Sequence, residues 1–260
     1  MSAFSVPGAE LDFELSDEGG HPVVQLHGLT SSRRRDRLLD LDLGRGLSGT
    51  RLLRYDARGH GRSSGRAAPD DYRWPVLADD LLRLLDAVFP DEAVHGVGPS
   101  MGAATLLHAA ARAPGRFSGF TLMLPPTAWS SRAARAGGYR EAADLVERSG
   151  LEAFVAMSRE EEAPPATVGR PETRPEVSAR LLPSVLRGAA GSDLPSLAEI
   201  SRIAVPVTIL AWVGDPGHPL STAEALAGAL PQARLRVART PDEVRGWPSI
   251  LRGDVPAPAV

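Results

Sequence analysis

The chain has 260 residues, of which 43% are hydrophobic and 23% are charged, a composition ordinary for a globular protein. It contains no cysteine, which excludes disulfides, thiolate zinc sites and a cysteine nucleophile. The formal net charge of −3 argues against nucleic-acid binding, and the absence of lysine excludes Schiff-base catalysis.

The first 20 residues lack the basic and apolar regions of a signal peptide. No apolar run approaches the roughly 18 residues that a membrane helix needs. We therefore expect a cytoplasmic protein with no membrane partner.

Apolar and polar residues alternate in patterns that predict a series of strands and helices. The expected strands cover residues 9–16, 21–26, 52–55, 93–97, 117–124, 205–213 and 234–238. The expected helices cover 33–41 (capped by Ser31 or Ser32), 75–88, 101–113, 132–147, 151–157, 177–187, 222–230 and 242–251. We expect Arg33, Arg34 and Arg35 to form a solvated helix face, and residues 160–162 and 255–260 to form a solvated loop and a loose tail.

Strands that alternate with helices predict an α/β fold with a mostly parallel sheet covered on both faces. The helical block at 127–202 interrupts this alternation, which indicates a cap or lid inserted into a core of residues 1–126 and 203–260. Such an insertion is expected over the carboxyl edge of the sheet, where open α/β sheets bind ligands.

One turn between a predicted strand and a predicted helix has the sequence Gly98-Pro99-Ser100-Met101-Gly102. Gly-x-Ser-x-Gly in this position is typical of a nucleophile elbow, which strains the central residue and needs small neighbours. A dinucleotide-binding fingerprint starting at Gly96 would need glycine where Met101 stands, and a phosphate-binding loop would need a lysine. The pattern therefore predicts an exposed serine hydroxyl.

Three further motifs accompany the elbow in a fixed order. They are His27-Gly28-Leu29, the segment 56–63 with the sequence Asp-Ala-Arg-Gly-His-Gly-Arg-Ser, and the segment 214–219 with the sequence Gly-Asp-Pro-Gly-His-Pro. With these motifs the chain resembles α/β-hydrolase-fold proteins and is similar to the small esterase, lactonase and haloperoxidase-like branch. The resemblance implies an α/β-hydrolase fold with a helical lid inserted after the sixth strand.

The resemblance also implies roles for individual residues. Ser100 would be the nucleophile, Asp215 would orient the catalytic base, and the backbone amides of Leu29 and Met101 would form the oxyanion hole. No cofactor and no metal are implied, and the expected partner is a small-molecule substrate. The expected pocket residues are His27, Gly28 and Trp129, with Tyr139, Phe154 and Met157 as further candidates from the lid and packing within the lid as the alternative.

The catalytic base departs from the family pattern. The resemblance places a histidine after the last strand, but residues 237–242 contain none and no histidine follows His218. Arg239 cannot act as the base because it stays protonated.

Three accounts therefore stay open. His218 (or, less favourably, His27) takes over as the base; Ser100, Asp215 and the oxyanion hole carry out lyase-like proton transfer; or the protein binds a ligand without catalysis. The leading hypothesis is a serine-type hydrolase that acts on a small carboxylic ester, lactone or related acyl substrate.

Overall fold

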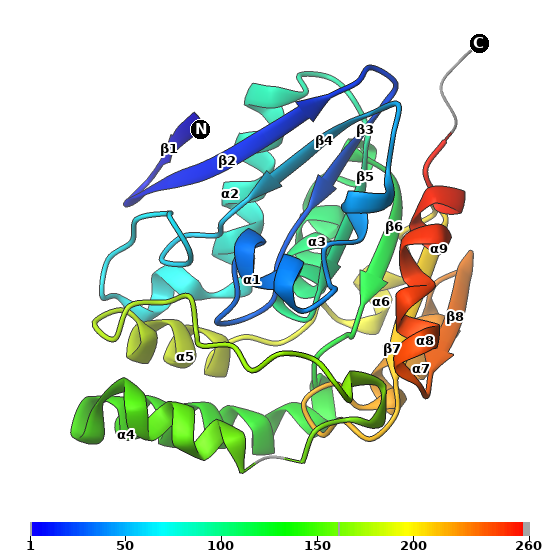
Figure 1. Cartoon of the computed structure of the whole chain (residues 1–260). Coiled ribbons are helices and arrows are strands. Elements are labelled where there is room, and N and C mark those ends of the chain that lie inside the picture. Colours follow the sequence, from blue (N-terminus) through cyan, green and yellow to red (C-terminus); the bar gives the residue numbers. More distant parts are fainter. Residues whose placement is uncertain (1, 161, 257–260) are drawn as a thin grey trace.

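The centre of the molecule is a twisted, mostly parallel sheet, seen in a computed structural model that describes residues 2–160 and 162–256. In this part of the chain the sheet has eight strands in the order β1-β2-β4-β3-β5-β6-β7-β8 (Figure 1). Only the pairs β1–β2 and β2–β4 are antiparallel. The strands are β1 (Ser2–Val6), β2 (Ala9–Asp17), β3 (His21–Gln25), β4 (Thr50–Tyr55), β5 (Val94–Pro99), β6 (Phe117–Met123), β7 (Val207–Trp212) and β8 (Ala233–Ala238).

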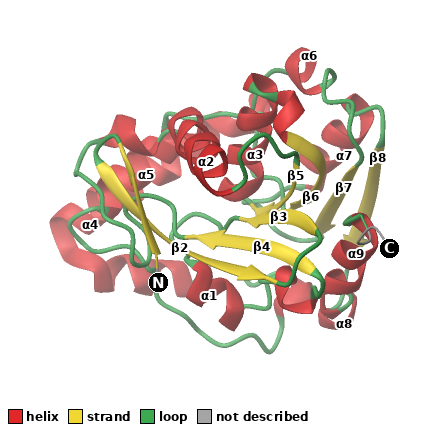
Figure 2. Cartoon of the chain, turned by 90° about the horizontal axis from the view of Figure 1, so that it is seen from above, coloured by secondary structure: helices red, strands yellow, loops and turns green. Residues whose placement is uncertain are grey.

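Helices cover both faces of this sheet. Figure 2 shows α2, α3, α6 and α7 on one face and α1, α8 and α9 on the other. Every residue of β5 and β7 is buried, which explains why His95 and Thr208 are the only polar side chains in these two strands. The helices are α1 (Arg33–Leu38), α2 (Trp74–Val88), α3 (Met101–Arg112), α4 (Arg132–Arg159), α5 (Leu182–Ala190), α6 (Leu197–Ile200), α7 (Leu220–Ala229), α8 (Pro241–Arg245) and α9 (Trp247–Asp254).

The part of the chain between β6 and β7 that carries α4 and α5 lies across the end of the sheet at which the parallel strands finish (Figure 1). Its helices α4 and α5 pack against each other around a separate apolar cluster. This cluster includes Ala143, Val146, Leu182 and Val185, all buried. The segment is therefore held next to the carboxyl edge of the sheet by a small core that Tyr72, from outside the segment, completes.

Several predicted boundaries are wrong for identifiable reasons. The short edge strand β1 was not expected, because its five residues are mostly exposed and carry no apolar pattern. The helices expected at 132–147 and 151–157 form the single element α4, which is kinked at Gly150 (φ 79°). The helix expected at 177–187 begins only at Leu182, since Pro183 fits the first turn of a helix and not its interior.

The helix expected at 242–251 is divided into α8 and α9. Pro248 lies in the first turn of α9, so a helix start there is favoured over continuation. Glu161 of the expected acidic loop and residues 257–260 of the expected tail lie outside the described residues. None of the helices in the described ranges is long and apolar enough to cross a membrane.

Candidate active site

Ser100 forms the turn between β5 and α3 and has a strained backbone. Its φ of 51° and ψ of −110° lie in a region that residues other than glycine rarely adopt. The strain is supported from both sides, because the Ser100 amide donates to the Met123 carbonyl (2.9 Å) and its carbonyl accepts from the Ala104 amide (3.0 Å). The serine is thus held as a sharp corner at the carboxyl edge of the sheet.

The two glycines of the elbow are needed because the backbone segments approach closely. A Cβ atom on Gly98 would lie 3.0 Å from Leu26 Cβ, and one on Gly102 would lie 2.9 Å from the same atom. A Cβ on Gly102 would also lie 3.0 Å from the His27 carbonyl oxygen. The expected crowding between strand and helix is therefore present, and it involves the two residues directly after β3 as well.

His218 contacts both Ser100 and Asp215. Its Nε2 lies 2.8 Å from Ser100 Oγ, and its Nδ1 lies 2.8 Å from Asp215 Oδ2. A neutral imidazole with its proton on Nδ1 satisfies both contacts, since Nδ1–H then donates to the carboxylate while Nε2 accepts from the serine hydroxyl. The structure thus brings together the three residues that the sequence analysis named as nucleophile, acid and candidate base.

Asp215 is held in place by four hydrogen bonds. Besides the imidazole, its Oδ2 accepts from Trp212 Nε1 (2.7 Å), and its Oδ1 accepts from the amides of Gly217 (2.8 Å) and His218 (3.2 Å). Burial acts to raise the pKa of Asp215, but the hydrogen bonds from His218, Trp212 and Gly217 outweigh it and hold the pKa far below its usual range. The carboxylate is therefore ionised at every physiological pH.

The segment expected to supply the base after the last strand has another structure. Thr240 is the N-cap of α8, and its side chain accepts from the Glu243 amide while the Glu243 carboxylate accepts from the Thr240 amide. Such a capping box satisfies the open end of a helix. Residues 239–243 therefore serve the start of α8.

The loop after β3 lies directly against Ser100. A Cβ atom on Gly28 would be 3.8 Å from Ser100 Cβ. The next residues, Leu29 and Thr30, line the same cavity as Ser100, and Thr30 has a positive φ of 59°. On the other side, Met101 is the first residue of α3, where a backbone amide has no partner within the helix.

A cavity of about 420 Å³ opens over Ser100 and His218. Gly28 lines it, as do three candidates from α4, namely Tyr139, Phe154 and Met157. Residues that the sequence analysis did not expect at the pocket also line it, among them Arg35, Asp36, Leu124, Arg135, Arg170 and Trp212. No local motif marks these residues, because distant segments bring them to the cavity.

Two expected pocket residues do not line the cavity. His27 is buried, its Nδ1–H donates to the Gly28 carbonyl (2.8 Å) and its Nε2 accepts from the Ala57 amide (2.9 Å). Trp129 turns away to bond Asp193 and Pro195 through its backbone amide and indole nitrogen. His27 thus positions the loop after β3, and Trp129 packs at the base of α4 against the main core.

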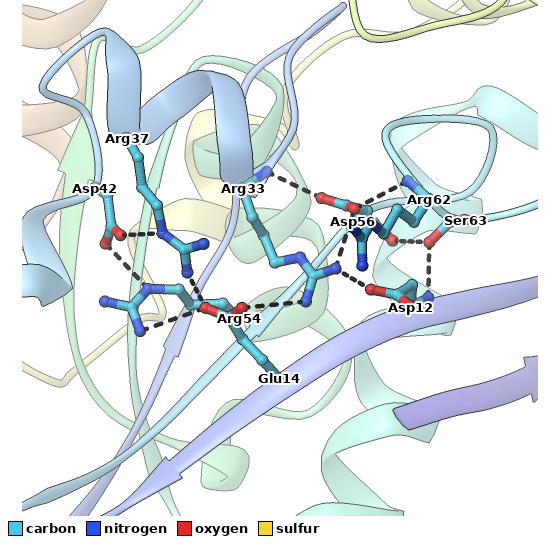
Figure 3. A network of polar contacts seen from close by, with 9 residues as sticks. All are labelled: Asp12, Glu14, Arg33, Arg37, Asp42, Arg54, Asp56, Arg62 and Ser63. Carbon is cyan, nitrogen blue, oxygen red and sulfur yellow. Dashed lines mark hydrogen bonds and ion pairs between the residues drawn. The ribbon is translucent and has the colours of Figure 1, made fainter. Parts of the chain in front are cut away.

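A charged network anchors the start of α1 to β2 and to the loop after β4 (Figure 3). Asp56 accepts from the Arg33 amide (2.9 Å) and the Arg62 amide (3.0 Å), and it pairs with the Arg33 guanidinium (3.2 Å). Arg33 also pairs with Asp12 on β2. Burial acts to raise the pKa of Asp56, but the hydrogen bonds from Arg33 and Arg62 lower it below its ordinary value. The expected solvated face is therefore wrong for Arg33, which is 8% exposed, and right for Arg34, which is 75% exposed.

Two further observations concern groups that could bind other ligands. His60, next to His27, is fully buried, and burial lowers its pKa to about 3, so it is a neutral structural residue. Among the described residues, no three histidine, aspartate or glutamate side chains are grouped so that they could hold a metal ion.

Comparison with known proteins agrees with the topology and the elbow. The family model for the alpha/beta hydrolase fold matches residues 21–149. The chain therefore has the α/β-hydrolase fold. This match includes the elbow and the loops after β3 and β4, whereas the turn with Asp215 and His218 lies beyond it.

Among solved structures, a thermophilic esterase from Thermogutta terrifontis is 19% identical with a TM-score of 0.77, covering 98% of this chain and 100% of the esterase. A hydrolase from Pseudomonas aeruginosa PA01 is 25% identical with a TM-score of 0.77, covering 97% of this chain and 96% of the hydrolase.

A curated relative from Bacillus subtilis (strain 168) carries the name 2-succinyl-6-hydroxy-2,4-cyclohexadiene-1-carboxylate synthase. It is 31% identical over 150 residues, which is 55% of this chain and 53% of the relative. The match therefore spans about half the length of that relative.

Proposed function

We propose that this α/β-hydrolase-fold protein is a serine hydrolase that cleaves small carboxylic esters, lactones or related acyl compounds. One observation carries the proposal, the continuous hydrogen-bonded chain from Ser100 through His218 to Asp215, with 2.8 Å at each step. A serine hydroxyl becomes a good nucleophile only when an adjacent base takes its proton, and a carboxylate must orient that base. Here one imidazole has both neighbours.

In the proposed reaction, Ser100 Oγ attacks the acyl carbon while its proton passes to His218 Nε2. The ionised Asp215 stabilises the imidazolium that forms. The amides of Leu29 and Met101 donate to the tetrahedral oxyanion. The start of α3 and the loop beside Ser100 favour an oxyanion at this position. His218 then gives the proton to the leaving alcohol. In the second half of the reaction His218 takes a proton from a water molecule that attacks the acyl-enzyme, and it returns this proton to Ser100 Oγ as the acid is released.

The segment 127–202 is part of this proposal as a cap domain. Its helix α4 lines the cavity over Ser100 through Arg135, Tyr139 and Phe154. Such a cover limits the access of water to the reacting atoms and shapes the substrate pocket.

The test uses a fluorophosphonate probe and a short p-nitrophenyl ester with the full chain. We expect the probe to label Ser100 and the ester to be hydrolysed, with kcat/KM lower by about 10⁴-fold or more in Ser100→Ala and in His218→Ala. His21→Gln is the matched control, because His21 begins β3 at the opposite end of the sheet and bonds Ser118. If the folded protein is neither labelled nor active on esters, the hydrolase proposal is wrong.

A second candidate is lyase-type chemistry, in which Ser100 and His218 move a proton without forming an acyl-enzyme. The partial match to the named synthase favours it. Intact-protein mass spectrometry during ester turnover separates the two. An acyl adduct on Ser100 supports the hydrolase, whereas probe labelling without any acyl adduct or ester turnover supports the lyase.

A further inference from the structure

Nη2 of Arg170 has no hydrogen-bond partner among the described residues, although Arg170 lines the cavity that contains Ser100. Its Nη2 is buried, and no carboxylate in the described ranges comes within ion-pair distance of it. A buried guanidinium donor without an acceptor costs stability, so such a group calls for a ligand or another functional reason.

Arg170 contacts Trp212, which in turn forms a hydrogen bond with Asp215 of the proposed triad. Its guanidinium carbon lies 5.0 Å from the centre of the Trp212 ring, a cation–π arrangement. The same indole donates from Nε1 to Asp215 Oδ2 at 2.7 Å. A ligand bound by Arg170 is therefore placed relative to the residues that hold His218.

A second guanidinium, that of Arg35, lines the same cavity. Its Nε donates to Thr173 Oγ1 (2.8 Å) and its Nη1 to the carbonyl and hydroxyl of Thr30 (both 3.1 Å). These acceptors are uncharged, so the positive charge of Arg35 is not neutralised by them. Arg35 and Arg170 also line an adjoining cavity of about 450 Å³, so both lie where the two cavities meet.

Two acids line the first cavity as well. Burial raises the pKa of Asp36 to about 7, so much of this carboxyl is uncharged near neutral pH. Glu141 is exposed to solvent, which screens its charge. Among the described residues neither acid lies within ion-pair distance of Arg35 or Arg170, although Asp36 acts on both guanidiniums, and Asp40 on that of Arg170, at longer range.

We propose that Arg170, with Arg35 on the same cavity, binds a free carboxylate of the substrate, so that the enzyme acts on acyl compounds that carry a second, anionic end. This inference rests on the proposed function of Ser100. A guanidinium presents two parallel N–H donors that match the two oxygens of a carboxylate, and the bond is strong where water is excluded.

The activity test compares two methyl esters of equal length, the monomethyl ester of glutaric acid and the same molecule with a neutral amide in place of its carboxylate. We expect the wild type to prefer the carboxylate ester, and Arg170→Gln to lower kcat/KM for that ester about 10- to 100-fold while changing the neutral ester less than threefold. Arg170→Lys keeps the charge but loses the two parallel N–H donors, so its kcat/KM for the carboxylate ester should lie between those of the wild type and Arg170→Gln. Arg174→Gln is the control, since Arg174 lies on the same loop, pairs with Glu152 and lines neither cavity.

A binding test does not depend on turnover. Calorimetry with Ser100→Ala measures glutarate binding, which Arg170→Gln should weaken in the double variant. If glutarate binds through Arg170 but no ester is hydrolysed, the carboxylate site stands and the hydrolase proposal fails. If both esters are hydrolysed equally well, or Arg170→Gln affects both alike, the carboxylate site is overturned while the hydrolase stands. If neither ester is hydrolysed and glutarate does not bind, both are overturned.

Discussion

Asp215 Oδ2 lies 2.8 Å from His218 Nδ1, although Pro216 and Gly217 alone separate the two residues in the chain. The two carboxylate oxygens have different partners. Oδ1 accepts hydrogen bonds from the amides of Gly217 and His218 and so fixes the turn. Oδ2 accepts hydrogen bonds from the imidazole and from the Trp212 indole. The acid and the base of the proposed triad therefore belong to one turn after β7.

This arrangement predicts the effect of Asp215→Asn. An asparagine can present its NH₂ group to the imidazole, which then carries its proton on Nε2 and cannot accept from Ser100. We expect kcat to fall about 10³-fold or more, the magnitude typical when a triad carboxylate is replaced by an amide. Stopped assays with a p-nitrophenyl ester measure it, with thermal melting as the check on folding. The control is Asp70→Asn, because Asp70 is exposed. If kcat of Asp215→Asn is less than tenfold below that of this control, Asp215 does not orient the base.

The elbow glycine Gly102 predicts a second result. A Cβ there would meet Leu26 Cβ at 2.9 Å, so Gly102→Ala should destabilise the fold by about 1–3 kcal/mol and displace Ser100. We expect reduced fluorophosphonate labelling and a lower free energy of unfolding in urea. Gly137→Ala on α4 is the control, because no atom lies within 4 Å of its added Cβ and alanine favours a helix. Equal behaviour of the two variants would contradict the close approach.

The adjacent arginines on α1 provide a matched pair. Arg33→Met leaves the buried Asp56 without its guanidinium and should cost about 3–5 kcal/mol in the free energy of unfolding. Arg34→Met removes an exposed ion pair with Glu176 and should cost less than about 1 kcal/mol. Chemical denaturation of both variants measures the difference. A loss for Arg33→Met as small as that for Arg34→Met would mean that the network in Figure 3 does not stabilise the fold.

The raised pKa of Asp36 predicts a pH dependence of stability. Burial raises this pKa from 3.8 to about 7, so between these values the unfolded chain loses the proton while the folded protein keeps it. Stability therefore falls as the pH rises through this window. Asp36→Asn removes the effect. The free energy of unfolding of this variant minus that of the wild type should therefore increase by about 2–3 kcal/mol from pH 5 to pH 8. Urea denaturation at the two pH values measures this, and Asp70→Asn should show no such change.

The order of strands and helices could be predicted because each element repeats a simple pattern. The buried strands β5 and β7 consist mostly of apolar residues, and the elbow combines a strained position with glycines at two fixed places. These signals are local, so the sequence alone contains them. The edge strand β1 depends on pairing with β2, which its own residues do not indicate.

Side-chain direction was harder to predict than position. The sequence placed Asp215 and His218 at the same sheet edge, but whether the imidazole reaches Ser100 depends on the turn through Gly217. Arg33 and Arg34 are neighbours with the same side chain, and only the packing of α1 on the sheet decides that Arg33 is buried. Arg170 lies on a loop without any motif, so its place beside Trp212 follows from tertiary structure alone.

The strand β8 ends the sheet and, within the described residues, pairs with β7 alone. Its outer edge offers unpaired amides and carbonyls to any other extended chain. The exposed Arg236 lies on this strand, as does Arg234, which Asp254 holds in an ion pair. Two such edges brought together would set like charges against one another, which opposes aggregation by edge-to-edge addition of strands. The charged alternation of this last strand thus protects the fold against open-ended growth of its sheet.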